Sequence, residues 1–197
     1  GKGQKLGNFL PFTDLKTFEN SLMFDDEAGN EYLYATPSAA GNRRKHSFSC
    51  WFKKGTDTTA TQPFFSAYGS NSDSGFREIR YVNDSITYSG YNTSYAIFYR
   101  DYDEISQWFH LLMHIDIDNS TASQRVRAWV NGIEQTQLST DNRSSLSGDS
   151  PMCSTISHRV GSASPGSVMY DGYMADVQFF DGTLVPVTTL GQTDTTT

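Results

Sequence analysis

Two groups of acidic residues have the side chains that glycoside hydrolysis requires. One group is Asp101, Asp103 and Glu104, and the other is Asp116 with Asp118. The reaction needs two carboxylates about 5–9.5 Å apart across a cleft. The first group precedes an expected strand in a loop, and the second lies at the end of a strand, where side chains commonly face solvent. We therefore expect no catalytic residue and no enzyme, and keep glycoside hydrolysis as a remote alternative.

Asp116, Asp118 and Asn119 form an oxygen-rich stretch suited to calcium. Calcium prefers carboxylate and carbonyl oxygens, and the stretch at residues 25–27 and the loop around Asp73 are oxygen-rich as well. No fixed spacing selects one of these loops; we nominate Asp116, Asp118 and Asn119 as the candidate metal ligands and Ca²⁺ as the one candidate cofactor. His110 and His114 fall on the same face of an expected strand, but strand geometry separates them by about 13 Å. One zinc ion cannot bridge that distance, so we expect both histidines to be structural or surface residues.

A tyrosine-rich stretch is the candidate ligand-binding site. Tyr88, Tyr91, Asn92 and Tyr95 combine aromatic rings with an amide. Aromatic rings stack on sugar faces, and amides form hydrogen bonds with sugar hydroxyls. The same tyrosines could instead pack across the outer face of a sheet or in a subunit contact, and the sequence leaves both interpretations open.

The cysteines and tryptophans are expected to serve the fold. Cys50 lies within an apolar strand, where a free thiol behaves as a small hydrophobic residue. Cys153 lies in a loop rich in serine and proline, and we expect no disulfide between the two. Trp51, Trp108 and Trp129 fall within expected strands and are predicted to lie in the core.

Net charge and hydropathy argue against nucleic acid and membranes as partners. The 197-residue chain has a net charge of −7, which disfavours binding to nucleic acid and to anionic lipid. The short basic run at residues 43–45 is interpreted as a solvated loop. No apolar run approaches the ~20 residues that a membrane-spanning helix needs, so we expect no membrane partner.

Turn signals and alternating residues indicate an all-β fold. Asn131-Gly132 separates two apolar-patterned runs over residues 125–138, which is a strong β-hairpin signal. Asp171-Gly172 and Asp181-Gly182 enclose another alternating run, which reads as one strand. About a dozen such short strands, with no convincing helix, predict two packed antiparallel sheets in a β-sandwich.

The same patterns divide the chain into three parts. Residues 1–20 are predicted to form an N-terminal arm or linker, because they are weakly patterned. Residues 21–186 contain the expected strands and form one β-sandwich domain, a size that suits a single unit. Residues 187–197 are threonine-rich and are predicted to be a flexible tail.

Two sets of residues resemble a known family. The first set is Trp51-Phe52-Lys53-Lys54, Trp108-Phe109-His110, residues 125–132, Arg159-Val160-Gly161 and residues 171–177, and in this order it resembles the laminin-G-like, pentraxin-like branch of the concanavalin A-like domains. The second set is Tyr32-Leu33, Thr36-Pro37, Ala40-Gly41-Asn42-Arg43, Phe180-Asp181-Gly182 and Pro186, and it resembles the form of this domain found in structural proteins of marine tailed phages. The resemblance covers about residues 20–192 and implies a concanavalin A-like jelly roll.

From the resemblance we expect a virion structural protein of a tailed phage. It would be an exposed head or tail appendage, or a decoration or fibre module, located in the virion after assembly in the host cytoplasm. Its expected partners are other virion proteins and host-surface polysaccharide, and a homo-oligomer such as a trimer is expected. The alternative is a lectin domain that binds carbohydrate with the help of calcium, because related domains often hold that ion on a loop rim.

Overall fold

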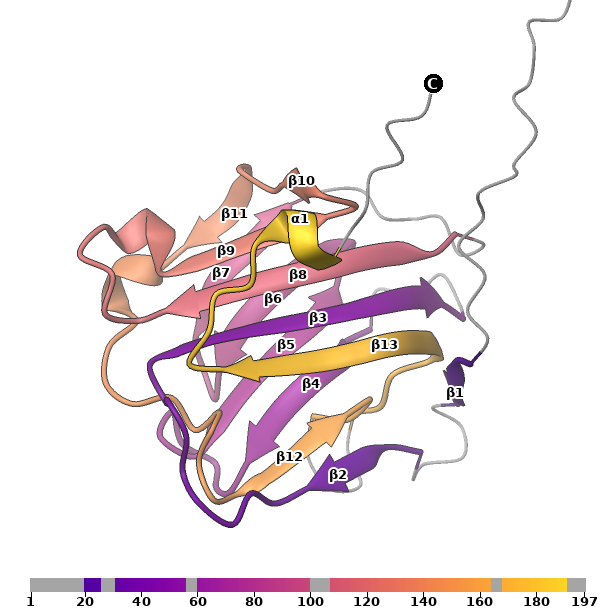
Figure 1. The fold of residues 1–197 in the computed structure, drawn as a ribbon, viewed down its shortest axis with the longest axis horizontal. Coiled ribbons are helices and arrows are strands. Elements are labelled where there is room, and N and C mark those ends of the chain that lie inside the picture. Colours follow the sequence, from indigo (N-terminus) through magenta and orange to yellow (C-terminus); the bar gives the residue numbers. More distant parts are fainter. Residues whose placement is uncertain (1–19, 26–30, 56–59, 100–106, 164–167, 191–197) are drawn as a thin grey trace, which may run out of the picture.

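The computed structural model describes residues 20–25, 31–55, 60–99, 107–163 and 168–190. They form two antiparallel sheets packed face to face (Figure 1). The six-stranded sheet contains, in spatial order, β1 (Leu22–Phe24), β13 (Gly172–Asp181), β3 (Lys45–Lys54), β8 (Phe109–Asp116), β9 (Val126–Val130) and β10 (Ile133–Glu134). The seven-stranded sheet contains β11 (Leu138–Asp141), β7 (Ser94–Tyr99), β6 (Ser85–Gly90), β5 (Phe76–Val82), β4 (Gln62–Tyr68), β12 (Ser157–Val160) and β2 (Leu33–Ala35). The prediction of an all-β sandwich is confirmed.

Aromatic side chains from both sheets fill the interior. Phe52 of β3 packs against Phe64 of β4 with ring centroids 4.7 Å apart. Phe65 of β4 stacks on Phe48 at 5.3 Å and on Phe179 of β13 at 5.0 Å. Strand alternation sends these rings to one face of each sheet. The interior therefore holds the two sheets together, and the remaining alternate positions face outward.

The predicted turns have the required backbone geometry. Asn131 and Gly132 have φ values of 51° and 78°, as a two-residue hairpin turn between β9 and β10 needs. Gly172 begins β13 with φ 138°, and a Cβ there would lie 2.2 Å from the carbonyl oxygen of Lys53. A side chain at this position would collide with β3, which explains the glycine.

The tryptophan prediction holds only for the burial of Trp129, because Trp51 and Trp108 are partly exposed and none of the three belongs to the buried cluster between the sheets. Trp51 alternates with the interior residues Cys50 and Phe52, so its ring lies on the outer face, 5.0 Å from the ring of His110. Trp129 is buried, but under the Arg127 guanidinium, 4.5 Å away, on that same outer face. Cys50 and Cys153 are both buried free thiols.

Some strand boundaries also differ from the expectation. β11 (Leu138–Asp141) begins at the end of the alternating run predicted over residues 125–138, extends beyond it, and pairs with β7 at the sheet edge. Val187–Leu190, assigned to the tail, forms the short helix α1. No helix in the described part of the chain is long and apolar enough to cross a membrane. Residues 1–19 and 191–197 lie outside the described residues.

His46 of β3 is a buried titratable group in the interior. Its side chain is 0 % exposed and stacks on Phe179 at 5.3 Å. Within the described residues, neither ring nitrogen of His46 has a hydrogen-bond partner. Burial lowers the pKa of His46 to about 3, although Asp181 opposes this shift. The folded protein therefore holds this imidazole neutral at pH values where the unfolded chain would protonate it.

We predict that His46 makes the protein less stable as pH falls from about 6.5 toward 3, because the unfolded state binds the proton first. Between pH 7 and pH 5 its contribution is about 2 kcal/mol, given about 1.4 kcal/mol per pKa unit. Urea denaturation at both pH values should show that His46→Leu loses less stability than the wild type. Equal losses in the two proteins would contradict the assignment.

Candidate functional site

A pocket of about 220 Å³ lies on the outer face of the seven-stranded sheet. Along β5, Ile79 and Tyr81 belong to the interior, so Glu78 and Arg80 alternate to the outside. The pocket combines aromatic, charged and amide side chains from three separate parts of the chain. Its lining residues are Thr61, Tyr68, Asn71, Phe76, Glu78, Arg80, Tyr91, Ala163 and Val168.

Three aromatic rings line this pocket. Tyr68 and Phe76 pack edge to face with centroids 6.1 Å apart. The Tyr68 hydroxyl donates a hydrogen bond to Asn71 Oδ1 at 3.1 Å. Tyr91 is 42 % exposed, and its backbone N–H donates to Asp73 Oδ1 at 2.8 Å. These contacts hold the rings in place, so the pocket presents apolar faces to a ligand.

Glu78 and Arg80 supply the charged part of the pocket. Arg80 Nη1 donates to Glu78 Oε1 at 2.5 Å, and the Ser89 hydroxyl donates to the same oxygen at 3.0 Å. Glu78 is only 2 % exposed, and burial raises its pKa while Arg80 opposes the shift. Among the described residues, Glu78 Oε2 and Arg80 Nε are buried without a hydrogen-bond partner. Native proteins rarely leave such atoms unsatisfied, so this pair has an acceptor and a donor whose hydrogen-bonding capacity the described residues leave unused.

A second cavity, of about 230 Å³, lies elsewhere and has different chemistry. It is lined mainly by apolar groups, among them Phe65 and Phe179. Its polar groups have partners: Asp181 accepts from the Asn42 N–H at 2.6 Å, and His158 donates to a backbone carbonyl at 2.8 Å. The pocket on the outer face is therefore the better candidate for recognising a polar ligand.

The structure places two of the four predicted ligand-binding residues at the pocket and the other two in the interior. Tyr91 lines the pocket, and Asn92 is exposed next to it. Tyr88 and Tyr95 are instead buried in the interior, 0 % and 6 % exposed. The Arg77 guanidinium lies 4.7 Å from the centre of the Tyr95 ring. The prediction of surface binding by Tyr88 and Tyr95 is therefore wrong, because both rings point between the sheets.

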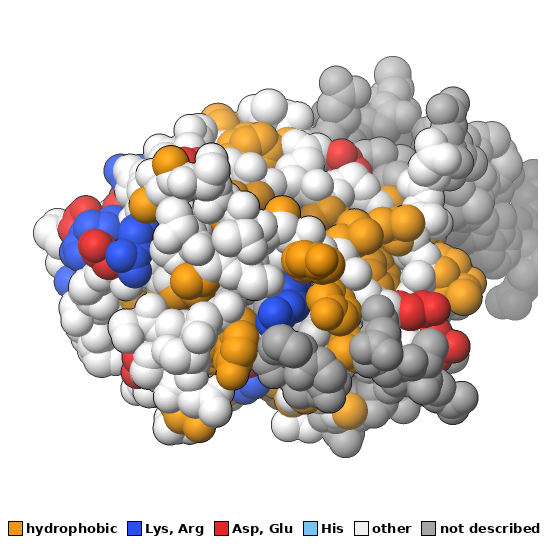
Figure 2. Space-filling model, turned by 90° about the horizontal axis from the view of Figure 1, so that it is seen from below, with side chains coloured by type: hydrophobic (Ala, Val, Ile, Leu, Met, Phe, Trp, Pro, Cys, Tyr) orange, Lys and Arg blue, Asp and Glu red, His pale blue; other side chains and the backbone are white. Residues whose placement is uncertain are grey.

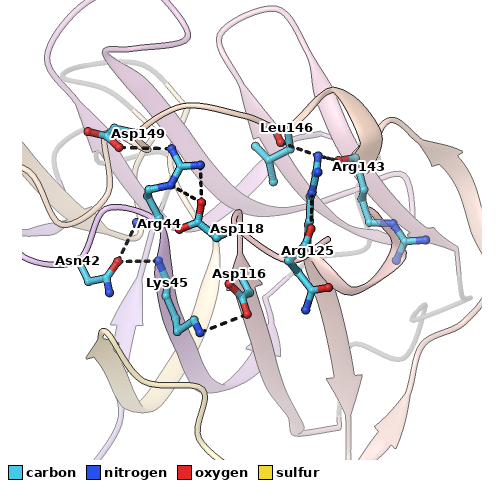
Figure 3. Close-up of polar contacts among 10 residues, drawn as sticks. Asn42, Arg44, Lys45, Asp116, Asp118, Arg125, Arg143, Leu146 and Asp149 are labelled. Carbon is cyan, nitrogen blue, oxygen red and sulfur yellow. Dashed lines mark hydrogen bonds and ion pairs between the residues drawn. The ribbon is translucent and has the colours of Figure 1, made fainter. Parts of the chain in front are cut away.

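The two aspartates among the proposed calcium ligands are held by basic residues (Figure 3). Arg44 Nε donates to Asp118 Oδ1 at 2.7 Å and holds the pKa of that carboxyl below its usual range. Lys45 Nζ lies 3.4 Å from Asp116 Oδ2. Asn119 Oδ1 accepts a backbone N–H at 3.0 Å. A calcium ion would have to displace Arg44, so Asp116, Asp118 and Asn119 do not form a preorganised calcium site.

The remaining predicted positions are structural or lie outside the described residues. His110 Nε2 is 2.9 Å from a serine hydroxyl of β3, and His114 Nε2 is 2.7 Å from the carbonyl oxygen of Val185. The expectation of structural histidines is confirmed. Within the described ranges, no group of three or more His, Cys, Asp or Glu residues is placed to hold a metal ion. The acidic residues 101–104 lie outside those ranges.

Of the nine residues that line the pocket, sequence reasoning found only Tyr91, and the aromatic and charged residues that it missed are Tyr68, Phe76, Glu78 and Arg80. Alternation along residues 76–82 offered a signal, since it separates Glu78 and Arg80 from the apolar Ile79. It could not show that β4, β5 and the turn after β6 come together. That convergence depends on pairings between strands, which a single sequence does not specify.

The chain belongs to the concanavalin A-like lectin/glucanases superfamily, whose model matches residues 27–187. Among solved structures it is similar to domain 4 of AbnA, an extracellular arabinanase from Geobacillus stearothermophilus in complex with arabinotriose. That match has 21% identity and a TM-score of 0.56, and covers 83% of this chain and 82% of the other.

Two further structures share the fold. A heptameric SAP-like pentraxin from Limulus polyphemus matches at 15% identity with a TM-score of 0.51, covering 75% of this chain and 68% of the pentraxin. The botulinum neurotoxin serotype D binding domain matches at 14% identity with a TM-score of 0.54, covering 84% of this chain and 39% of the other. No curated protein sequence matches. At these identities the likenesses establish the fold alone.

We predict that calcium leaves the thermal stability of the protein unchanged. Arg44 and Lys45 already neutralise the candidate ligands, so the ion gains no free site at Asp116 and Asp118. Melting temperatures measured in calcium and in a chelator should agree. An ion present at 100 times its Kd would stabilise the fold by about 2.7 kcal/mol, so a rise of several degrees in calcium would contradict this account.

Proposed function

We propose that this domain binds carbohydrate in the pocket on the outer face of its seven-stranded sheet. The observation that carries the proposal is the combination of aromatic walls with the unsatisfied Glu78 Oε2 and Arg80 Nε. A sugar presents apolar C–H faces and a rim of hydroxyls. Tyr68 and Tyr91 would stack on the faces, while Glu78 would accept and Arg80 donate hydrogen bonds.

The size of the pocket suits part of a larger glycan. Its volume of about 220 Å³ is smaller than the ~300–1,000 Å³ usual for drug-sized ligands. A polysaccharide would therefore place one end or a short segment in the pocket and leave the rest outside. The arabinanase domain of the same fold, whose structure contains arabinotriose, supports an oligosaccharide as the ligand class.

The proposed mechanism is binding, without catalysis. Glycoside hydrolysis generally uses two carboxylates. Among the described residues that line the pocket, Glu78 is the single carboxylate, and one of its oxygens is already bound by Arg80. Asp116 and Asp118 form ion pairs elsewhere, with Lys45 and Arg44. This arrangement favours a recognition domain over a hydrolase.

We further propose that the domain is an exposed appendage or decoration module of a tailed-phage virion that binds host-surface polysaccharide. The resemblance in sequence supports this placement. Attachment would use the edge strands β1 and β2, which carry exposed apolar side chains: Leu22 (48 %), Met23 (60 %), Leu33 (51 %) and Tyr34 (72 %). Figure 2 shows hydrophobic side chains gathered on the face seen from below. Such a patch suits contact with other virion proteins or with further copies of this chain.

The carbohydrate proposal predicts that Tyr91→Ala weakens glycan binding about 5- to 50-fold, because an aromatic contact and its buried area are lost. Host-surface polysaccharides would first be screened on an array, and the affinity of the best ligand then measured by calorimetry. Tyr99→Ala is the matched control, since Tyr99 is an exposed tyrosine of the same sheet, 58 % accessible, that does not line the pocket. Equal affinities for both variants and the wild type would contradict the proposed site.

If β1 and β2 form the contact surface, we predict that the protein self-associates and that this association depends on their exposed apolar side chains. Leu33→Ser should shift the protein toward monomer in light scattering, because it removes an exposed apolar side chain from β2. Ile133→Ser, at the opposite edge on β10 and 60 % exposed in the wild type, is the control and should not change the mass. A wild-type monomer at every concentration would contradict the expected homo-oligomer.

A further inference from the structure

Arg159 of β12 is a buried cation without a counter-charge. Its residue is 7 % exposed, and both Nε and Nη1 are buried without a hydrogen-bond partner. Within the described part of the chain, the Arg159 guanidinium forms no ion pair and donates no hydrogen bond. Arg80, on the same outer face, is instead paired with Glu78 at 2.5 Å. Among the described residues of this face, Arg159 is therefore a basic group whose charge is left unmatched.

Two tyrosines position the Arg159 guanidinium beside the pocket. Its central carbon lies 5.7 Å from the centre of the Tyr32 ring and 5.6 Å from that of Tyr68. Tyr68 also lines the pocket, so Arg159 adjoins the proposed sugar site. Tyrosine faces attract the cation, but they do not accept the N–H bonds in the plane of the guanidinium. The described residues therefore leave the hydrogen-bonding capacity of Arg159 Nε and Nη1 unused.

Strand register places Arg159 on the same row as the pocket carboxylate. Arg159 is opposite Ser66 on β4, and Ser66 is opposite Glu78 on β5. Two strand spacings separate the backbones of Arg159 and Glu78 by about 10 Å. The Ser66 hydroxyl between them donates to the carbonyl oxygen of Ser162 at 2.6 Å, so it does not neutralise Arg159. Different sugar units of one glycan could therefore contact Glu78 and Arg159.

We infer that the glycan bound at this face is acidic and that Arg159 recognises its carboxylate or sulfate group. The inference rests on the proposed carbohydrate-binding function and names the ligand class of that site. A guanidinium suits both anions, because its planar N–H donors match their oxygen atoms. Burial lowers the pKa of Arg159 while Tyr32 and Tyr68 oppose the shift, which agrees with a desolvated cation that an anion would stabilise.

The net charge of the chain argues against non-specific binding of acidic ligands. With a net charge of −7, the protein repels an acidic polymer at long range. Non-specific attraction therefore cannot account for a preference for acidic ligands. Such a preference would have to come from a local site, and Arg159 is the unmatched basic group beside the pocket.

The test compares ligands that differ only in charge. Calorimetry would measure the affinity of the protein for oligogalacturonate and for its methyl-esterified neutral form, and likewise for dextran sulfate and for dextran. The first pair tests recognition of a carboxylate, and the second pair tests recognition of a sulfate. We expect the wild type to bind the acidic member of at least one pair about 10- to 100-fold more tightly, as charged hydrogen bonds allow. Arg159→Gln should remove this preference while the neutral member binds as before.

Two further variants exclude indirect effects. Arg159→Lys keeps the charge and the apolar stem, so it should retain part of the preference even if Arg159→Gln is less stable. Arg127→Gln is the matched control, because Arg127 also lies over an aromatic ring, 4.5 Å from Trp129, but is paired with Glu134 on the other sheet. This control should bind acidic and neutral ligands as the wild type does.

The outcomes separate the inference from the function on which it rests. Equal binding of acidic and neutral ligands, unchanged by Arg159→Gln but weakened by Tyr91→Ala, would overturn the acidic ligand and keep the carbohydrate site. An acidic preference that persists in a folded Arg159→Gln protein would overturn the role of Arg159. Unchanged binding of every ligand by Tyr91→Ala would instead contradict the proposed site itself.

Discussion

The packing of aromatic rings between the two sheets is the constraint on which the rest of the molecule depends. Phe52 and Phe64 meet across the interior at 4.7 Å, and Phe65 joins Phe48 to Phe179. Because these rings fix which face of each strand is buried, they also fix which residues face outward. A shift of one residue along β5 would turn Glu78 and Arg80 into the interior and abolish the pocket.

The outer faces of the two sheets differ in how fully their charged side chains are hydrogen-bonded. On the six-stranded sheet, Arg127 forms a two-point contact with Glu134, at 2.7 Å for each hydrogen bond. On the seven-stranded sheet, Glu78 Oε2, Arg80 Nε and the Arg159 donors stay unsatisfied. Leaving buried polar atoms unpaired destabilises a fold. Buried atoms in the interior, such as both His46 ring nitrogens and Arg77 Nε, are left unsatisfied by the described residues too. The outer-face atoms differ because they lie beside the exposed ring of Tyr91 in a pocket, and this is the physical basis for assigning recognition to this face.

The sequence was informative about the fold and much less so about the site. Alternating residues and the Asn131-Gly132 turn are local signals, and they predicted the all-β class and the β9–β10 hairpin correctly, although some strand boundaries differ. The tyrosine prediction failed because Tyr88 lies within β6 and points inward, whereas Tyr91 follows the end of that strand. The calcium prediction overlooked Arg44, which is 74 residues from Asp118 in sequence. Contacts between distant residues depend on strand order, and no local pattern records it.

The most direct test of the central claim is an NMR titration of the ¹⁵N-labelled protein with the oligosaccharide that binds best. The account predicts that amide shift changes gather on the outer face of the seven-stranded sheet, around Tyr68, Glu78 and Tyr91, whose side chains line one pocket. Shift changes confined to the outer face of the six-stranded sheet, around Trp51 and Trp129, would contradict it.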